Sequence, residues 1–158
     1  VLQASILNAR PVKPGLELTV IDSTLKPNQS RRTTWGETPV LFVPSVPMDR
    51  MATFYAAQDV LLAPSIWPES YGLVTREALS AGLWVVASDV GALAEPIRHG
   101  ENGHCFRSGD SSALTQILEE LSRAHPQPQP LIAFQDEHLP LHIELSNSYA
   151  KWTKTPAK

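Results

Sequence analysis

The 158-residue chain is 42% hydrophobic and 18% charged, and it carries a formal net charge of -3 at pH 7. This size and composition suit one ordinary soluble domain and leave no room for a second. The charge gives no basic excess with which to neutralise a phosphate backbone, so we expect no nucleic-acid partner. Cys105 is the only cysteine, which excludes an intrachain disulfide and a clustered thiolate metal site and agrees with a cytoplasmic location.

The N-terminal residues lack the basic and apolar regions of a signal peptide. No later stretch approaches the roughly 20 apolar residues of a membrane span. The chain starts without a methionine, in a segment with a helical pattern. We therefore expect an upstream part of the protein to be missing.

Apolar runs alternate with helix-period segments along the chain. Most of the runs are nearly continuous, as in strands that helices cover on both faces. The predicted strands are residues 16–21, 40–43, 59–63, 83–87 and 104–106. The predicted helices are residues 49–58, 72–81, 92–99 and a segment capped by Ser108 or Asp110, in which Leu114, Ile117, Leu118 and Leu121 follow i, i+3, i+4, i+7. In the first of these helices, Met51, Phe54 and Tyr55 share one apolar face. This order predicts the α/β class, with a doubly wound, mainly parallel sheet.

Three further segments complete the chain. Residues 28–34 read as a surface loop that holds the basic pair Arg31-Arg32. The alternating prolines of residues 126–130 cannot continue a helix and predict a stiff spacer, and residues 139–152 follow as a last helix. We therefore place a Rossmann-like domain at residues 1–125, and a Pro-rich spacer with a C-terminal tail or helix at residues 126–158.

Residues 64–79 are the segment that carries chemistry. They follow a predicted buried strand, and ligands of open α/β sheets bind outside the carboxyl ends of the strands. Gly72 lets the backbone approach a ligand closely. The first amides of the helix that begins there have no acceptors within the helix and lie at its positive end. Such a helix tip predicts an anion site, here suited to a diphosphate.

Two glutamates flank this helix tip. Glu77 lies five residues beyond Gly72, about 7.5 Å along the helix axis. Its carboxylate can accept hydrogen bonds from two neighbouring ribose hydroxyls. Glu69 precedes the helix, where it can face a sugar rather than the nucleoside. The pair leaves room for a nucleotide-sugar between them.

Glu69 and Glu77 belong to a longer ordered pattern. It reads Pro-Ser-x3-Glu-Ser-x-Gly-Leu-Val-x2-Glu-Ala-Leu-Ser-Ala-Gly, followed by Val-Val-Ala-Ser at residues 85–88 and Gly-x3-Glu at residues 91–95. Each piece is weak alone, but the ordered combination is highly specific. It resembles the C-terminal domain of the retaining family-4 glycosyltransferases, which have the GT-B fold. The resemblance covers roughly residues 2–121 and is strongest over residues 59–106.

The resemblance implies roles for the matched residues. Glu77 would hold the ribose hydroxyls, and Glu69 would approach the donor sugar as the second catalytic glutamate. The donor-binding positions would be the backbone amides of Tyr71, Gly72, Leu73 and Val74, together with the loop at Gly91. The reaction would transfer a hexosyl group from a nucleotide-diphosphate sugar to a glycan or lipid-linked acceptor in polysaccharide biosynthesis. The leaving phosphate would help to deprotonate the acceptor on the same face, and the protein would act by positioning and charge stabilisation.

The resemblance implies no cofactor and no metal. Metal-dependent sugar transferases hold Mg²⁺ or Mn²⁺ with Asp-x-Asp, which this sequence lacks. His138 and His142 have a metal-ligand spacing, but Pro140 between them argues against a shared helix face. We expect a metal-independent enzyme.

The sequence also departs from the family pattern. Family members clamp the phosphates with an Arg and a Lys on a segment that should precede Val1. Asp22-Ser23 stands where a glycine is usual after the first predicted strand, which puts a base contact there in doubt. The acceptor-binding N-terminal domain and the first strand of the donor domain are not in this sequence. We therefore expect this chain alone to bind donor without turnover, and we leave open a peripheral association of the full-length protein with the inner membrane leaflet.

Other interpretations stay open. The domain could be a catalytically inactive nucleotide-sugar-binding or interaction module, or part of a GT-B nucleotide-sugar epimerase. Glu77 alone would read as an exposed helix glutamate, and Gly72 and Gly91 as ordinary turn glycines. Cys105 reads as a small buried filler, and Trp67 lies close enough to the site to stay open as a sugar-stacking residue.

Overall fold

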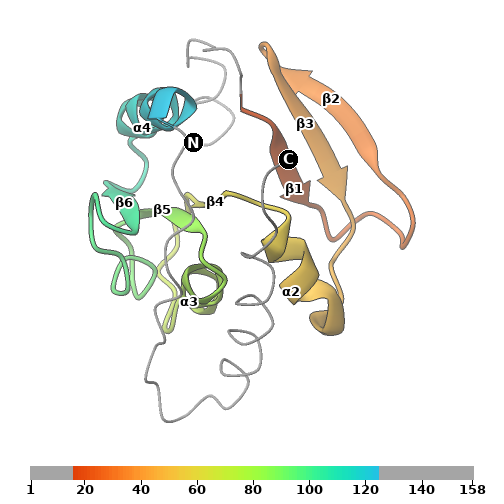
Figure 1. Cartoon of the computed structure of the whole chain (residues 1–158), viewed down its shortest axis with the longest axis horizontal. Helices are drawn as coiled ribbons and strands as arrows, with labels where there is room; N and C mark the ends of the chain where they lie inside the picture. The colour runs from red at the N-terminus through yellow and green to blue at the C-terminus, as the bar shows by residue number, and fades with distance from the viewer. Residues whose placement is uncertain (1–15, 125–158) are drawn as a thin grey trace, which may run out of the picture. The chain divides into compact units, whose positions relative to one another are not determined.

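The computed structural model describes residues 16–124. These residues are drawn in colour in Figure 1, and they divide into two compact units. One unit contains residues 16–50 and 109–124, and the other contains residues 51–108. The predicted spacer at residues 126–130, the predicted helix at residues 139–152 and the histidines His138 and His142 lie outside the described residues.

The first unit contains a three-stranded sheet. Its strands are β1 (Leu18–Ile21), β2 (Arg31–Trp35) and β3 (Thr38–Val43), in the order β1-β3-β2. β1 runs parallel to β3, and β2 runs antiparallel to it. The two predicted strands of this region are confirmed as β1 and β3.

The predicted surface loop at residues 28–34 is wrong, because most of it belongs to β2. Only Thr33 and Trp35 of this strand are partly buried, while its other residues are exposed. The Arg31 guanidinium lies 4.0 Å from the ring centroid of Phe42, and the Trp35 ring meets the same ring edge-on at 6.1 Å. These contacts with β3 hold an edge strand whose charged, threonine-rich sequence has little apolar signal of its own.

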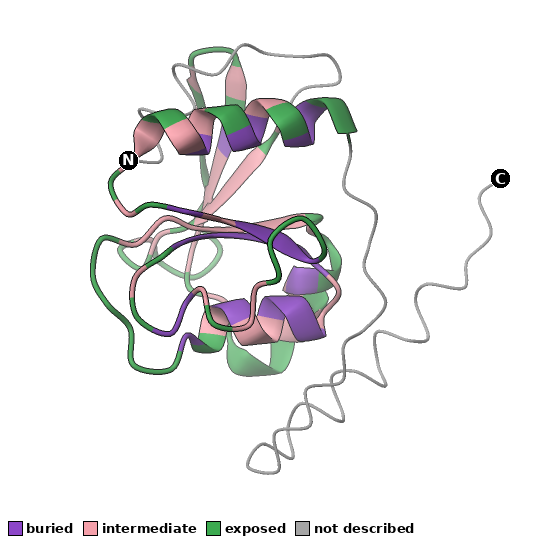
Figure 2. Cartoon of the chain, turned by 90° about the vertical axis from the view of Figure 1, so that its left-hand side faces the viewer, coloured by how far each residue is buried: buried purple, intermediate pink, exposed green. Residues whose placement is uncertain are grey.

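Helix α4 (Ser111–Ala124) belongs to the same unit and confirms the periodic prediction. Its four predicted apolar residues are all buried, and they group along one side of the helix (Figure 2). Of the two predicted caps, Asp110 is the correct one, since its Oδ1 accepts the Ala113 N–H at 2.9 Å. Ser108 belongs to the other unit, where its N–H donates to Asp89 Oδ1 and its hydroxyl donates to the Ser65 carbonyl.

The second unit is built on a parallel sheet. Its strands are β4 (Val60–Ala63), β5 (Trp84–Ser88) and β6 (Gly103–Phe106), in the order β4-β5-β6. All its pairings are parallel, and the central strand β5 is buried along its whole length. Helix α2 (Met48–Ala56), which begins just before the unit boundary, precedes β4, and helix α3 (Leu73–Ser80) connects β4 to β5. The predicted α/β class with mainly parallel strands is confirmed, with the strands divided between two sheets.

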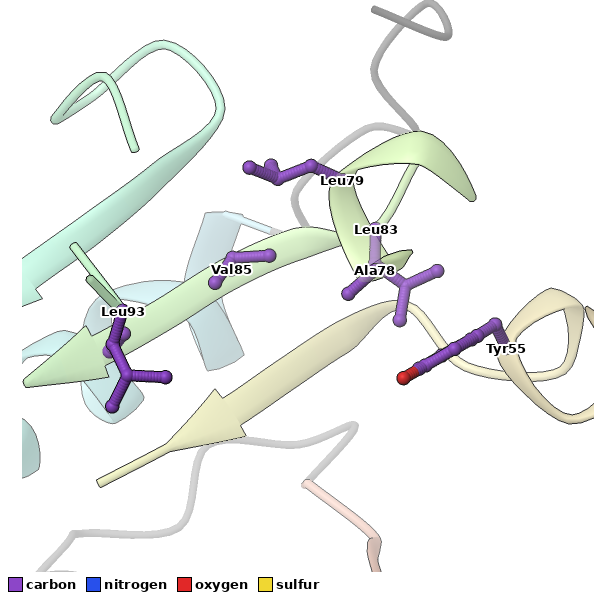
Figure 3. Close-up of a cluster of buried hydrophobic side chains, with 7 residues drawn as sticks. Tyr55, Ala78, Leu79, Leu83, Val85 and Leu93 are labelled. Atoms are coloured by element: carbon purple, nitrogen blue, oxygen red, sulfur yellow. The ribbon is translucent and has the colours of Figure 1, made fainter. Parts of the chain in front are cut away.

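A cluster of buried side chains forms the core of this unit. It joins Tyr55 from α2 to Ala78 and Leu79 from α3, and to Leu83, Val85, Ala87 and Leu93 (Figure 3). The two helices and the strands they pack on are therefore fixed by one apolar contact region. This region lies directly beneath the residues of α3 that carry the predicted site.

The predicted helix at residues 92–99 is wrong, because this segment consists of turns between β5 and β6. Pro96 cannot donate a backbone hydrogen bond within a helix. The buried side chain of Asn102 holds the segment instead, since its Oδ1 accepts the Arg98 N–H at 2.7 Å and its Nδ2 donates to the Pro96 carbonyl at 3.2 Å. The apolar residues of the segment, such as the fully buried Leu93, fill the core from a loop.

Within residues 16–124, every helix is too short or too polar to cross a lipid bilayer.

Candidate functional site

The loop between β4 and α3 starts from a fixed point at Ser65. The carbonyl oxygen of Ser65 accepts hydrogen bonds from the hydroxyls of Ser88 at 2.6 Å and Ser108 at 3.1 Å. These serines lie at the end of β5 and just beyond β6. The hydroxyl of Ser65 also accepts the Trp67 N–H at 3.1 Å and donates to the Trp67 carbonyl at 2.9 Å. The loop is thus tied to the carboxyl ends of neighbouring parallel strands, where the sequence predicts a site.

Gly72 ends this loop and begins α3. Its φ of 65° and ψ of 44° place it in the left-handed region, which glycine adopts readily. A Cβ at this position would lie 2.6 Å from the carbonyl oxygen of Ala92. The β4–α3 loop therefore contacts the loop that follows β5 through backbone atoms. No side chain caps the helix, and the hydroxyl of Thr75 donates to the Gly72 carbonyl at 2.8 Å instead. The amides of Leu73 and Val74 therefore lie at a helix N-terminus with no acceptor in their own helix.

Glu69 and Gly91 lie side by side on these two loops. They pair as an isolated parallel bridge, and the Ala92 N–H donates to the Glu69 carbonyl at 2.8 Å. Gly91 has a φ of 57°, and a Cβ there would lie 2.6 Å from the Glu69 nitrogen and even closer to the Glu69 carbonyl oxygen. The structure thus brings Glu69, Gly72 and Gly91 together, with the Glu69 side chain exposed.

Glu77 lies one helical turn beyond the free amides, on the same helix. Its side chain is partly buried, unlike that of a simple surface glutamate. Its Oε2 accepts a hydrogen bond from the hydroxyl of Tyr55, at 3.2 Å. This role of Tyr55 was not predicted, because its spacing with Met51 and Phe54 indicates only an apolar helix face. The signal that could have found it is general: a buried tyrosine hydroxyl needs a hydrogen-bond partner.

Arg76 forms a second unpredicted link between the loops. Its Nε donates to the Tyr71 carbonyl at 3.0 Å, and its Nη2 forms an ion pair with Glu95 Oε2 at 2.8 Å. The guanidinium also lies 4.8 Å from the Tyr71 ring centroid. The Arg76 side chain is only 18% exposed, so this contact fixes the end of the β4–α3 loop against the segment that follows Gly91.

The same loop exposes large apolar side chains. Of the six exposed large hydrophobic residues in the described part of the chain, four lie on the β4–α3 loop or at the first residue of α3: Ile66, Trp67, Tyr71 and Leu73. Trp67 is the most exposed of them, at 75%. The loop that leads to the predicted anion site therefore carries exposed apolar side chains, among them the candidate sugar-stacking tryptophan.

The described residues contain no group of three or more His, Cys, Asp or Glu side chains placed to hold a metal ion. The predicted independence from metals and cofactors stays a prediction. His99 and His104 contact each other edge-on at 4.9 Å, and the buried His104 packs against Trp84 at 5.4 Å. These contacts give the two histidines a packing role.

The partly buried Cys105 should react slowly as a nucleophile. Burial raises the pKa of its thiol, and the negative charge of Asp89 raises this pKa further. Less thiolate therefore forms at pH 8 than on an unperturbed cysteine. We expect slower alkylation by iodoacetamide in the native chain than in the urea-unfolded chain, and faster alkylation in Asp89→Asn than in the native wild type. Equal rates in the native and unfolded chains would contradict this account of the thiol.

The family relationship follows from the sequence as a whole. Residues 8–133 match the family described as Glycosyl transferases group 1. The chain belongs to this family. The match covers the helix tip, both glutamates and Gly91, so the resemblance drawn from residues 64–95 is confirmed at the family level.

The glycosyl transferases group 1 assignment agrees with individual relatives. The chain is 49% identical over 65 residues to a phosphatidyl-myo-inositol mannosyltransferase of Mycobacterium leprae, covering 41% of this chain and 17% of that protein. It is 45% identical over 89 residues to a D-inositol 3-phosphate glycosyltransferase of Acidothermus cellulolyticus, covering 54% of this chain and 20% of that protein. The chain thus spans about a fifth of the length of these curated relatives.

Solved structures of GT-B glycosyltransferases resemble the fold. One is the Anabaena protein Alr3699/HepE in complex with UDP-glucose, with a TM-score of 0.54 and 25% identity over 74% of this chain and 32% of that chain. Another is a sucrose-phosphate synthase from Thermosynechococcus elongatus, with a TM-score of 0.50 and 32% identity over 54% of this chain and 21% of that chain. The group 1 chain therefore has the α/β fold of a GT-B glycosyltransferase domain.

Proposed function

We propose that this chain is the donor-binding domain of a retaining, metal-independent glycosyltransferase that uses a nucleotide-diphosphate sugar. The observation that carries the proposal is the arrangement of α3, which has an uncapped N-terminus and, one turn further on, the Glu77 carboxylate bonded to Tyr55. A diphosphate and the ribose next to it are about as far apart as these two features, some 6 Å along the helix. The UDP-glucose bound to the similar Anabaena protein supports a donor of this class.

Each predicted residue has a place in this proposal. The diphosphate accepts hydrogen bonds from the amides at the tip of α3, which carries the positive end of the helix dipole. Glu77 accepts hydrogen bonds from the ribose hydroxyls. Glu69 and the backbone at Gly91 lie on the adjoining loops, where they face the donor sugar. The exposed Trp67 is available to stack against a sugar ring.

The chemistry proposed for this site is stabilisation of the charge on the leaving diphosphate, without a covalent intermediate on the protein. When the bond between the sugar and the diphosphate breaks, negative charge grows on the diphosphate oxygens. Preorganised amides at the helix tip stabilise that charge more in the transition state than in the ground state. The acceptor oxygen then bonds to the anomeric carbon on the face that the diphosphate leaves, while the departing phosphate takes the acceptor proton, so the configuration of the sugar is retained.

The site residues named above are all assigned to the donor, and none is assigned to the acceptor. The names of the relatives indicate acceptors built on inositol, one of them part of a lipid. We propose a glycan or lipid-linked acceptor held by another domain of a larger protein, at a cytoplasmic site or at the inner face of a membrane. Donor binding is the part of the function that this chain can be expected to perform.

A thermal-shift screen tests the proposal directly. We expect one class among UDP-, GDP- and ADP-sugars to raise the unfolding temperature of the 158-residue chain, because a ligand that binds only the folded state stabilises it by about 2.7 kcal/mol at 100 times its dissociation constant. The shift should persist in excess EDTA, and free glucose or mannose should give none. Absence of a shift with every nucleotide-sugar at millimolar concentration would overturn donor binding. A shift that disappears in EDTA would overturn metal independence alone.

A further inference from the structure

Tyr55 occupies a position that packing alone does not require. It lies near the end of α2, and only 7% of its surface is exposed. Its ring belongs to the core cluster with Ala78 and Leu83 (Figure 3). A phenylalanine ring would fill the same space, so packing does not account for the hydroxyl. That hydroxyl donates to Glu77 Oε2 at 3.2 Å, across 22 positions of sequence.

We propose that Tyr55 is a positioning residue that holds the Glu77 carboxylate ready for the two ribose hydroxyls of the donor. The pair would thereby make the site selective for ribonucleotides over nucleotides that lack these hydroxyls. This inference rests on the proposed function, because it needs Glu77 to contact the ribose. It adds a residue on a different helix, α2, to a site otherwise built from α3 and two loops.

The physical reason lies in the freedom of a glutamate side chain. A partly exposed glutamate samples many rotamers and loses that freedom when it binds a ligand. The Tyr55 ring is fixed in the core, so its hydroxyl anchors one carboxylate oxygen before the ligand arrives. A site that is preorganised in this way binds more tightly, because less conformational entropy is lost on binding.

The hydrogen bond from Tyr55 occupies only part of the acceptor capacity of the Glu77 carboxylate. An ionised carboxylate offers about four lone-pair positions, of which the Tyr55 hydroxyl takes one. The positions on Oε1 and the second position on Oε2 stay available for two neighbouring ribose hydroxyls. Ala78, the residue after Glu77, is completely buried in the core, so the backbone beneath the carboxylate is fixed as well. Glu77 can therefore accept the Tyr55 hydroxyl and the ribose hydroxyls at the same time.

Tyr55→Phe removes the hydroxyl and keeps the ring, and calorimetry then measures binding to the 158-residue chain. The probes are UDP, GDP and ADP, each with its 2′,3′-dideoxy counterpart. We expect the variant to bind the preferred ribonucleotide roughly 3- to 10-fold more weakly than wild type, the range of a single hydrogen bond. Its affinity for the dideoxy counterpart should be unchanged. Thr53→Val, which removes an exposed hydroxyl from the same helix, should change neither affinity.

A double-mutant cycle with Glu77→Ala, which removes every acceptor oxygen of the side chain, asks whether Tyr55 acts through Glu77. If it does, Tyr55→Phe should have a smaller effect in the Glu77→Ala background than in the wild type, since the two residues would act as one unit. Additive effects would overturn the inference. Thermal unfolding of each variant checks that it is folded.

The outcomes separate this inference from the proposed function. Selective binding of the ribonucleotide by wild type, with Tyr55→Phe equal to wild type, would overturn the role of Tyr55 and leave donor binding intact. An equal loss of ribo- and dideoxynucleotide affinity in Tyr55→Phe would reduce Tyr55 to a structural role and also overturn the inference. Equal binding of both nucleotides by wild type would remove Glu77 from the ribose, and the role of Tyr55 with it. Failure of wild type to bind any of these nucleotides would overturn the proposed function itself.

Discussion

Gly91→Ala should destabilise the chain by about 2–5 kcal/mol, because it combines two separate penalties. The first is the left-handed backbone, since a residue with a Cβ at a φ of 57° is strained whatever its surroundings. The second is steric, because the new methyl group would lie 2.6 Å from the Glu69 nitrogen. The neighbouring atoms are backbone atoms, which cannot rotate away as a flexible side chain would. The loops must separate instead, which breaks the bridge between Glu69 and Gly91 and should abolish donor binding.

Gly100→Ala is the matched control for this change. Gly100 also has a positive φ, of 80°, but a Cβ there meets nothing within 4 Å. It should therefore show only the backbone penalty, about 1–2 kcal/mol. Chemical denaturation of the two variants gives the comparison, and nucleotide binding to each gives the functional consequence. Equal destabilisation by the two alanines would mean that the contact between the loops contributes nothing.

The local features of the site were predictable because each has a local signature. A glycine at the start of a helix, a preceding apolar strand and two glutamates at fixed positions all follow from short-range pattern, and the structure has the strand and the helix at those places. The bridge that joins Glu69 to Gly91 spans 22 positions. Nothing in the sequence of either loop specifies that approach. Only the glycine at residue 91 hints that two backbones come close there.

Both errors arose because apolar periodicity registers neither cross-strand pairing nor polar side chains that bind the backbone. β2 has two exposed arginines and an exposed threonine, Thr34, yet it pairs along its whole length with β3 and gains ring contacts to Phe42. Residues 92–99 have helical spacing, yet Asn102 binds their backbone and Pro96 interrupts them. The buried polar group that decides the second case is a single asparagine three residues past the segment. Apolar periodicity does not register such a polar contact, even one that lies close in the sequence.

The hydrogen bond from Tyr55 to Glu77 escaped prediction for a related reason. Tyrosine has both an apolar ring and a polar tip, and a periodic pattern registers only the ring. The ring was assigned correctly to a buried helix face, as the core cluster confirms. The partner of its hydroxyl depends on how α2 and α3 pack on the same strands. Glutamates beside a predicted ligand site and tyrosines on buried faces are therefore pairs worth testing when only a sequence is known.

Glu77→Ala should weaken donor binding by a few kcal/mol, the largest functional loss that we expect from a change that leaves the fold intact. Each hydrogen bond between a carboxylate and a ribose hydroxyl contributes about 1.5–3 kcal/mol, so losing one or two lowers the affinity by an order of magnitude or more. Isothermal titration of wild type and variant with the nucleotide-sugar selected by thermal shift measures the change. Alanine has high helix propensity, so α3 itself should persist.

Two variants make this loss interpretable. Glu120→Ala removes an exposed helix glutamate from α4, and it should leave donor affinity unchanged, which excludes a general effect of net charge. Glu77→Gln keeps the size of the side chain and one acceptor oxygen but removes the charge, so its affinity should fall between those of wild type and Glu77→Ala. A neutral amide can still accept from one ribose hydroxyl, although more weakly than a carboxylate. If Glu77→Ala and Glu120→Ala bind donor as well as wild type does, the ribose is held elsewhere, and α3 can contribute only its N-terminal amides to the site.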